Sequence, residues 1–395
     1  MTAEDFVFGR DQIAERSGRS VADHADRVAG TRIVEVAAIP YALPYRRPAR
    51  FASGAVERAD NVLVRIHTDA GLVGHAEAQP RPYTYGETQA SIVAAVRGWF
   101  APRLLGMRPG AIEEARAAFA GLAGNHCARG AVDVALWDLL GQLAGIPCST
   151  LLGGYADRVA VAHMISFDTP DAMADDAAAV HAEHGVRAFK VKVGRDPELD
   201  IAAVAAIRDA LPDAALYADA NRGWTLAQAI EAGDALVALG VGAIEEPIAI
   251  EDLRGRALLA ERWDVPLAGD ESCLSLTDVR RAIAEGAVGQ VSVKTARTGF
   301  SESRDVLGLC RAERMPVVVG SQYEGALGAL ASIAFGAAFA ETASRPVEAT
   351  NFHDLATDLL AELPRTVDGH VAVPSAPGLG YVIDDDALAA ARLEG

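Results

Sequence analysis

Lys190-Val191-Lys192 opens the stretch that decides the fold, which continues through Asp219-Ala220-Asn221, Glu245-Glu246-Pro247 and Asp270-Glu271-Ser272 to Lys294. From Lys192, the steps to Asp219, Glu245, Asp270 and Lys294 are 27, 26, 25 and 24 residues. Such steps fit one strand, one helix and two short loops, given strands of about 5 and helices of about 11–12 residues. Each signature closes a short apolar run, which places its charge at the C-terminal end of a strand. Because these ends meet on one face of a parallel α/β barrel, the spacing predicts five β/α units that share one site.

The composition is that of a large globular chain. It has 395 residues, 51% of them apolar, which predicts a large core divided between two domains. The net charge of 36 − 54 = −18 argues against nucleic acid and anionic membranes as partners. An anionic substrate remains compatible with it, because a bound cation and nearby lysines reverse the field inside one cleft.

Cysteine spacing and hydropathy indicate the compartment. Four cysteines show neither metal-site nor disulfide-framework spacing, which predicts reduced thiols: Cys127, Cys148, Cys273 and Cys310. The sequence shows no apolar segment long enough to span a bilayer and no secretory segment behind its polar N-terminus. A cytoplasmic location is therefore expected.

Three segments with different patterns predict the domain organisation. Residues 1–30 are polar and charged and are expected to form an N-terminal extension. Residues 31–155 carry β-rich stretches followed by helical segments, which predicts an α+β capping domain that residues 366–395 complete. Residues 156–365 alternate strand and helix about eight times, the pattern of a (β/α) barrel catalytic domain. The predicted fold class is therefore α/β, a modified TIM-type barrel with an N-terminal α+β capping domain.

Three carboxylates on consecutive predicted strands, Asp219, Glu245 and Asp270, have no His or Cys in register with them. Hard oxygen ligands favour Mg²⁺, with Mn²⁺ as the alternative, and count against Zn²⁺. Three such ligands leave positions of a divalent ion open to a substrate carboxylate. In the alternative interpretation, each carboxylate caps a helix or pairs with an arginine. The recurrence of a carboxylate at three consecutive strand ends favours the metal site over this alternative.

The lysines indicate proton transfer at carbon. Lys190 and Lys192 are two residues apart on a strand, so both side chains point to the same face. Two ammonium groups this close to each other, near a divalent cation, repel each other, which is expected to lower the pKa of at least one. A lysine nearer neutrality suits a general acid and base at carbon. Lys294 approaches from the opposite side of the barrel, and the metal would stabilise an enediolate between them. The alternative, a pair of surface lysines on an edge strand, conflicts with a barrel that has no edge.

Supporting or substrate-binding roles are assigned to eight further residues: Asn221, Glu271, Ser321, Gln322, Glu324, Arg50, Phe51 and Tyr83. Glu271 is expected to orient Lys294, or else to stand in the first turn of a helix. Residues 320–325 follow a predicted strand and add polar groups at the same barrel face. Residues 44–56 and 81–87 are expected to cover the mouth of the barrel, or to be ordinary hairpin connections.

Together these residues resemble the enolase superfamily, specifically its muconate lactonizing subgroup. The subgroup shares a Lys-x-Lys strand, Asp, Glu and Asp metal ligands on the next three strands and a lysine on the sixth. All are present here in order. The resemblance extends from about Arg32 to the C-terminus and includes residues 131–138, 151–154 and 377–380.

The resemblance implies reversible cycloisomerisation of cis,cis-muconate to muconolactone in aromatic catabolism, a small dicarboxylate substrate and Mg²⁺. One substrate carboxylate would bind Mg²⁺, the other would add to the ring-closing carbon, and a lysine would protonate the resulting enolate. Lys192 is the expected acid, tuned by Lys190, while Lys294 stabilises charge across the site or is itself the acid. The family also implies a homo-oligomer.

Four segments are similar to one set of muconate lactonizing enzymes: residues 50–54, 81–88, 221–224 and 294–300. The chain departs from the family at Gly299-Phe300, where many members have Gly-Gly, and at Gln322-Tyr323, where Thr-Met is common. Residues 351–354 lack the Asp-x-Asp pair of dipeptide epimerases. The alternatives are a racemase or epimerase of N-acylamino acids or dipeptides, or an o-succinylbenzoate synthase, with the same catalytic residues. A more remote one is a non-catalytic barrel that binds an anionic metabolite.

Overall fold

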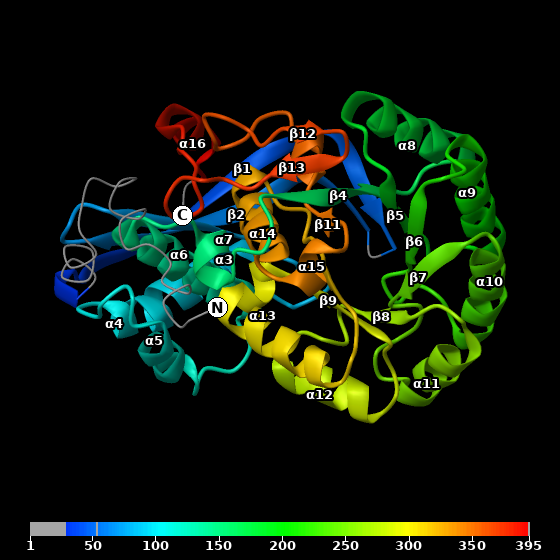
Figure 1. The fold of residues 1–395 in the computed structure, drawn as a ribbon, viewed down its shortest axis with the longest axis horizontal. Coiled ribbons are helices and arrows are strands. Elements are labelled where there is room, and N and C mark those ends of the chain that lie inside the picture. The colour runs from blue at the N-terminus through cyan, green and yellow to red at the C-terminus, as the bar shows by residue number, and fades with distance from the viewer. Residues whose placement is uncertain (1–28, 53, 394–395) are drawn as a thin grey trace, which may run out of the picture.

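The computed structural model describes residues 29–52 and 54–393, so residues 1–28 of the expected N-terminal extension lie outside the described part. The first domain contains an antiparallel sheet in the order β1-β2-β3, built from β1 (Ile33–Phe51), β2 (Gly54–Thr68) and β3 (Val73–Ala78). The β1–β2 hairpin is much longer than predicted. Its tip reaches the barrel (Figure 1), where the Arg50 carbonyl accepts a hydrogen bond from the Phe167 N–H at 3.2 Å.

Helices of the first domain pack on this sheet: α3 (Gln89–Ala95), η2 (Val96–Phe100), α4 (Ala101–Leu104), α5 (Ile112–Phe119), α6 (His126–Ala144) and α7 (Cys148–Leu152). The element η2 is a turn of π-helix between α3 and α4. Helix α6 is buried almost all round, because it lies between β3 and the second domain's α13 (Thr295–Ala312). It is therefore the main contact between the two domains.

The described part of the second domain has eight successive parallel strands: β4 (Arg158–Ile165), β5 (Ala188–Lys192), β6 (Ala215–Asp219), β7 (Val241–Glu245), β8 (Leu267–Gly269), β9 (Gln290–Val293), β10 (Val317–Val319) and β11 (Val347–Glu348). Strand β11 pairs with β4 and lies against β10, although the described residues form no ladder between β10 and β11. The predicted barrel with an N-terminal capping domain is thus confirmed.

Helices alternate with the strands: α8 (Pro170–His184), α9 (Pro197–Ala210), α10 (Leu226–Ala238), α11 (Leu253–Arg262), α12 (Leu276–Ala284), α13, α14 (Ala326–Ala338) and α15 (Ala340–Ala343). Helices α8 to α12 form an outer ring in Figure 1. Local sequence sets several of their starts, because side chains accept hydrogen bonds from first-turn N–H groups. These caps are Thr169, Asp196, Thr225 and Ser275.

The C-terminal tail, from Thr366 onward, first pairs with a different domain than expected. Strands β12 (Thr366–Val367) and β13 (His370–Ala372) form a hairpin, and β13 pairs antiparallel with β4 in the barrel sheet. The chain returns to the first domain only afterwards, where the Leu379 N–H and the Tyr381 hydroxyl donate to Asp138 of α6 at 2.8 and 2.6 Å. The hairpin was expected in the capping domain, but its backbone groups instead extend the barrel sheet on one side of β4. The last helix, α16 (Asp385–Ala391), contacts β1.

Buried carboxylates of the first domain hold barrel backbone. Glu77 on β3 accepts hydrogen bonds from the N–H groups of Gly325 and Gly328, at 3.0 and 2.9 Å, where α14 begins. Asp133 on α6 accepts from the N–H of Phe300 at 2.7 Å. Beside it, Gly299 has φ +59°, and a Cβ there would lie 2.5 Å from the Asp133 carboxylate. The family departure at Phe300 is accommodated, because this buried ring stacks on Phe335 with 6.4 Å between centroids.

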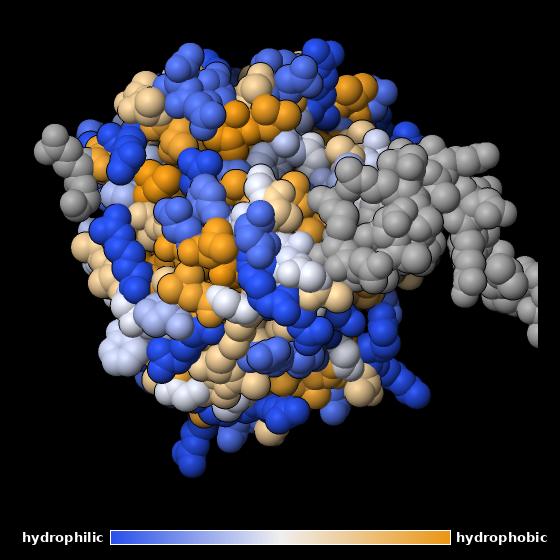
Figure 2. All heavy atoms as spheres, turned by 90° about the vertical axis from the view of Figure 1, so that its left-hand side faces the viewer, coloured by the Kyte–Doolittle hydropathy of each residue, from blue (hydrophilic) through white to orange (hydrophobic). Residues whose placement is uncertain are grey.

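The helices of the described part do not have the character of membrane-spanning segments. Among the described residues, no helix combines the length and apolar character that crossing a bilayer requires. On the face drawn in Figure 2, hydrophobic side chains form patches among hydrophilic ones. In the first domain Val34, Trp99 and Leu105 are each more than half exposed, at 53%, 57% and 51%. Single exposed side chains of this kind are common on protein surfaces, and the expected homo-oligomer stays a prediction.

Candidate active site

The two lysines of β5 point into the barrel. Along this strand the buried Phe189 and Val191 belong to the hydrophobic core, while Lys190 and Lys192 occupy the alternate positions. Both lysines are nearly fully buried, at 2% and 6% exposure. With Lys294, which is 5% exposed, they are the only lysines among the 395 residues of the chain.

Lys190 is surrounded by carboxylates. Its Nζ lies 2.8 Å from Glu245, 3.2 Å from Asp219 and 3.1 Å from Glu348. Burial opposes the charge of this ammonium group, but the three carboxylates outweigh burial and raise the pKa well above its usual value. The carboxylates that face Lys190 exceed the ammonium groups in number, so repulsion between the lysines does not set this pKa. A lowered pKa for at least one lysine beside a bound divalent cation stays a prediction.

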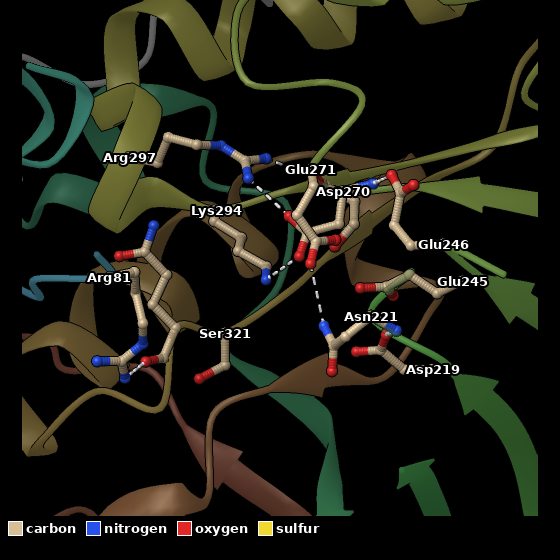
Figure 3. Close-up of polar contacts among 12 residues, drawn as sticks. Arg81, Asp219, Asn221, Glu245, Glu246, Asp270, Glu271, Lys294, Arg297 and Ser321 are labelled. Atoms are coloured by element: carbon tan, nitrogen blue, oxygen red, sulfur yellow. Dashed lines mark hydrogen bonds and ion pairs between the residues drawn. The ribbon is translucent and has the colours of Figure 1, made fainter. Parts of the chain in front are cut away.

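Lys192 and Lys294 lie on opposite sides of the barrel, on β5 and just after β9. The Nζ of Lys192 donates to Asp219 at 2.6 Å and to Asn221 at 2.7 Å. The Nζ of Lys294 donates to Asp270 at 2.5 Å, as Figure 3 shows. Burial opposes the Lys294 charge, yet Asp270 raises the pKa of this lysine above its ordinary value. Both side chains reach one cavity.

The three predicted metal ligands end consecutive strands. Asp219 closes β6, Glu245 closes β7 and Asp270 follows β8, and each is 1% exposed. Burial raises the pKa of Glu245 well above its usual value, and Asp219 adds to that effect. Asp219 itself is held at a pKa of about 2, because Lys192 and Lys190 outweigh the effect of burial.

Glu246 fixes the backbone that carries Asp270. One carboxylate oxygen accepts from the Asp270 N–H at 2.6 Å, and from the Ser272 N–H at 2.9 Å. The other oxygen meets the Arg256 guanidinium of α11 at 2.5 Å, in a pair that is 0% exposed on both sides. Glu246 also has φ +41°, an uncommon conformation for a residue other than glycine. Figure 3 shows it behind Asp270, away from Lys294.

Glu271 was expected to orient Lys294, but its carboxylate contacts other residues. Its Oε1 accepts from Asn221 Nδ2 at 3.2 Å and lies 3.6 Å from the Arg222 guanidinium. Burial and the neighbouring Asp270 raise the pKa of Glu271 to about 7. Arg297, rather than Glu271, shares Asp270 with Lys294, because its guanidinium lies 2.6 Å from the second carboxylate oxygen.

The loop after β10 forms another wall. Ser321 donates its N–H to Glu348 at 3.0 Å and its hydroxyl to Glu324. The Gln322 N–H donates to Glu324 at 2.6 Å, and the Gln322 carbonyl accepts from Arg81 of the first domain (Figure 3). Ser321 and Gln322 line the cavity, whereas Glu324 lies behind them and holds the loop.

The cavity has a volume of about 400 Å³. Its lining joins the barrel to residues of the first domain: Ala55, Val56, Arg81, Tyr83, Tyr85, Met164, Lys190, Lys192, Asn221, Asp270, Glu271, Lys294, Ser321, Gln322, Tyr323 and Glu348. Tyr83, which is 69% exposed, stands at the mouth. Residues 54–56 and 81–85 therefore do cover the barrel, as predicted.

One predicted residue, Arg50, is not brought to this cavity. Arg50 lines a separate cavity of about 470 Å³, and its guanidinium lies 3.5 Å from Asp168. Strand β1 continues to Phe51, through residues that were expected to form a covering segment or a hairpin connection, and so carries Arg50 past the catalytic cavity. The Phe51 side chain and Ser53 lie outside the described residues.

Three residues with direct roles were missed. Glu348 binds Lys190 and accepts from the Tyr217 hydroxyl at 2.8 Å. It ends β11, so the strand-end rule that found Asp219 would also have found Glu348. Arg297 lies in α13, within the similar segment 294–300, but nothing in that segment indicates a contact with Asp270. Glu246 directly follows Glu245 in the sequence, but its pairing with Arg256 depends on the fold.

A divalent cation fits the donor set. The described residues contain no group of His, Cys, Asp or Glu arranged as a formed metal site, because lysines contact the candidate ligands directly. However, the three carboxylates Asp219, Glu245 and Glu348 face only two ammonium groups, those of Lys190 and Lys192, and burial strongly disfavours that excess of negative charge. Another cation would relieve it, and hard oxygen donors favour Mg²⁺.

Family models match most of the chain. Residues 33–153 match the N-terminal domain of the mandelate racemase / muconate lactonizing enzyme family. Residues 172–387 match the enolase C-terminal domain-like family. Together these matches cover both described domains.

Individual relatives fall into more than one activity. A crystal structure of the muconate lactonizing enzyme from Mycobacterium smegmatis, complexed with muconolactone, is 42% identical, covers 92% of this chain and 100% of its own, and has a TM-score of 0.91. Muconate cycloisomerase 1-2 of Acinetobacter lwoffii is 33% identical over 90% of this chain and 94% of that protein. The dipeptide epimerase of Enterococcus faecalis, complexed with Mg and L-Leu-L-Tyr, is 28% identical over 89% of this chain and 99% of its own, with a TM-score of 0.84.

These relatives share the fold and differ in substrate, so the family is established while the individual reaction is not. Relatives of this kind are enzymes that act on small molecules. The chain therefore belongs to the enolase superfamily, in its muconate lactonizing enzyme subgroup.

Proposed function

We propose that this enzyme is a muconate cycloisomerase, which interconverts cis,cis-muconate and muconolactone in the cytoplasm as part of aromatic catabolism. The observation that carries the proposal is the placement of Lys192 and Lys294 on opposite sides of one cavity, over buried carboxylates. The similarity to the Mycobacterium smegmatis enzyme, whose structure contains muconolactone, supports the choice of substrate.

Asp219, Glu245 and Asp270 would hold Mg²⁺, with Mn²⁺ as the alternative. The bound cation would orient one substrate carboxylate and stabilise the negative charge that develops on it. Glu246 keeps the Asp270 backbone in place through its N–H contact at 2.6 Å. Arg297 binds the other oxygen of Asp270 at 2.6 Å, which fixes the direction of that carboxylate.

The remaining chemistry belongs to the lysines. An oxygen of the second substrate carboxylate forms the ring C–O bond, and the electron pair of the attacked double bond moves toward the first carboxylate as an enolate. The Lys192 ammonium then gives one proton to the enolate carbon and becomes a neutral amine. Asp219 and Asn221 hold Lys192 Nζ at 2.6 and 2.7 Å, which sets its direction. Lys190, beside Lys192, keeps its positive charge. Lys294 stabilises the negative charge of the enolate from the other side of the cavity.

A racemase or epimerase of N-acylamino acids or dipeptides is the second candidate. The same opposed lysines favour it, because one amine can remove an α-proton while the other delivers a proton to the opposite face. The similarity to a dipeptide epimerase supports this reading. Residues 351–354, however, lack the Asp-x-Asp pair of dipeptide epimerases. The carboxylate that they do contain, Asp354, accepts a hydrogen bond from the Tyr323 hydroxyl at 2.8 Å.

The first experiment is to incubate the purified protein with cis,cis-muconate and follow loss of the diene absorbance. With Mg²⁺ we expect fast loss that EDTA stops and added Mg²⁺ restores. A Lys192→Arg variant is the matched control, because arginine keeps the charge and cannot give up its proton at neutral pH. Absence of turnover, together with deuterium exchange into N-succinylamino acids or dipeptides in D₂O, would instead identify a racemase or epimerase.

The proposed homo-oligomer has its own test. Light scattering on the purified protein should give a mass that is a multiple of the 41.3 kDa chain. A monomer mass at micromolar concentration would contradict this proposal and leave the reaction unaffected.

A further inference from the structure

Two cavities lie side by side at the mouth of the barrel. The first, of about 400 Å³, contains the three lysines. The second, of about 470 Å³, lies between the β1 hairpin, α8 and the end of β4. Tyr323 and Met164 line both cavities, so their side chains stand between them.

Tyr323 is held firmly in this position. Its hydroxyl donates to Asp354 at 2.8 Å, and its ring lies 4.8 Å from that of Tyr45 between centroids. Its N–H donates to Ser321 Oγ at 2.7 Å. The backbone has φ +66°, which is rare for an aromatic residue, and the side chain is only 6% exposed. A strained backbone that is anchored at both ends points to a function for the ring.

The second cavity offers positive groups to a carboxylate. Arg46, Arg47 and Arg50 line it together with four carboxylates, Asp168, Asp176, Glu183 and Asp354. Burial lowers the pKa of His353 to about 4, so this imidazole adds no charge near neutral pH. Arg47 pairs with Asp176 at 2.5 Å. Arg46 donates to the His353 carbonyl at 3.2 Å and makes none of the ion pairs found among the described residues. Arg46 is therefore the guanidinium available to a second carboxylate.

We propose that Tyr323 determines substrate length, because its ring closes the catalytic cavity toward the cavity that contains Arg46. With the ring in place, a dicarboxylate must fit within the lysine cavity. Without it, a longer dicarboxylate would pass between the cavities and reach Arg46. The inference rests on the proposed function for the dicarboxylate class of ligand, and it goes beyond that function in assigning the length limit to one side chain.

The test is equilibrium binding of saturated dicarboxylates, which are not turned over. Succinate, adipate, suberate and sebacate are titrated by calorimetry into the full-length protein in Mg²⁺ buffer. In Tyr323→Gly the ring is removed, and glycine also relieves the strain at φ +66°. Tyr323→Phe is the matched control, because it keeps the ring and loses only the bond to Asp354. Met164→Ala opens the same wall from the other side, should the glycine variant fail to fold.

The native protein and Tyr323→Phe should bind adipate more tightly than suberate or sebacate. In Tyr323→Gly the order should reverse, with suberate gaining about tenfold over adipate because its second carboxylate reaches the Arg46 guanidinium. Adding Arg46→Met to Tyr323→Gly should remove that gain. An unchanged length preference in both Tyr323→Gly and Met164→Ala would overturn the proposal. Because the measurement needs no turnover, a failure of the muconate assay alone would refute the proposed function and leave this inference standing.

Discussion

The buried pair of Arg256 and Glu246 should matter far more for stability than a surface pair on the same helix. We would replace Arg256 with methionine, which has a similar length and no charge. Glu246 would keep its contacts to Asp270 and Ser272 but would lose the guanidinium at 2.5 Å, in surroundings where neither side chain is exposed. Removing one partner of a fully buried pair costs about 3–5 kcal/mol, because the other charge stays buried without compensation.

Arg262 supplies the matched control. It lies at the other end of α11 and pairs with Asp234, at exposures of 44% and 42%. Pairs in such a solvated position contribute about 0–1 kcal/mol. Urea unfolding of Arg256→Met, Arg262→Met and the native protein should therefore give a gap of at least about 2 kcal/mol between the two variants.

A second readout separates positioning from stability. Because Glu246 holds the Asp270 backbone, loosening it in Arg256→Met should raise the Mg²⁺ concentration for half-maximal activity by about 10–100-fold. Arg262→Met should leave that concentration unchanged. Equal unfolding free energies for the two variants would refute the argument, as would an unaltered Mg²⁺ requirement in Arg256→Met.

Three further predictions concern other parts of the site and the domain contact. Lys192→Ala should lower kcat on muconate by about 10²–10⁴-fold with an unchanged circular dichroism spectrum, and near-native turnover would remove Lys192 as the acid. Burial raises the pKa of Asp133 from 3.8 to about 6, so the folded state binds its proton more tightly and stability is lost as pH rises between these values. Compared with Asp133→Asn in urea, the native protein should lose about 3 kcal/mol over that range, and parallel pH profiles would contradict the burial argument. Gly299→Ala should destabilise the protein by more than about 1 kcal/mol, because φ is +59° and the new Cβ would strike Asp133. Gly308→Ala, on the same helix with open space around it, should be neutral or stabilising in the same melts.

The catalytic strands were predictable because their signal repeats. Lys192, Asp219, Glu245, Asp270 and Lys294 each end an apolar run after about one β/α unit, and the structure puts all five at one end of the barrel. A periodic signal of this kind survives errors of one or two residues at element boundaries.

The positions of the other site residues depend on contacts between segments that lie far apart in the sequence. Arg297 acts from a helix and reaches Asp270 only through the packing of α13. Arg50 was misplaced because β1 runs on to Phe51, although prolines such as those at positions 44 and 48 are uncommon inside a strand. Glu348 was left out of the charges around Lys190 because it lies more than 150 residues away in the sequence.

The confinement of all three lysines to the cavity makes the primary amine a chemical label for the active site. The rest of the positive charge is arginine, which amine reagents do not modify under mild conditions. Reductive methylation with ¹³C-formaldehyde also labels the amine of the N-terminus. Among side chains it can introduce only three signals, one for each of Lys190, Lys192 and Lys294. Their titration would be read directly in the intact enzyme, without mutation and without interference from the surface. The same scarcity means that lysine side chains offer no surface point for attachment to a support, and the four cysteines are buried as well, so immobilisation should use a tag.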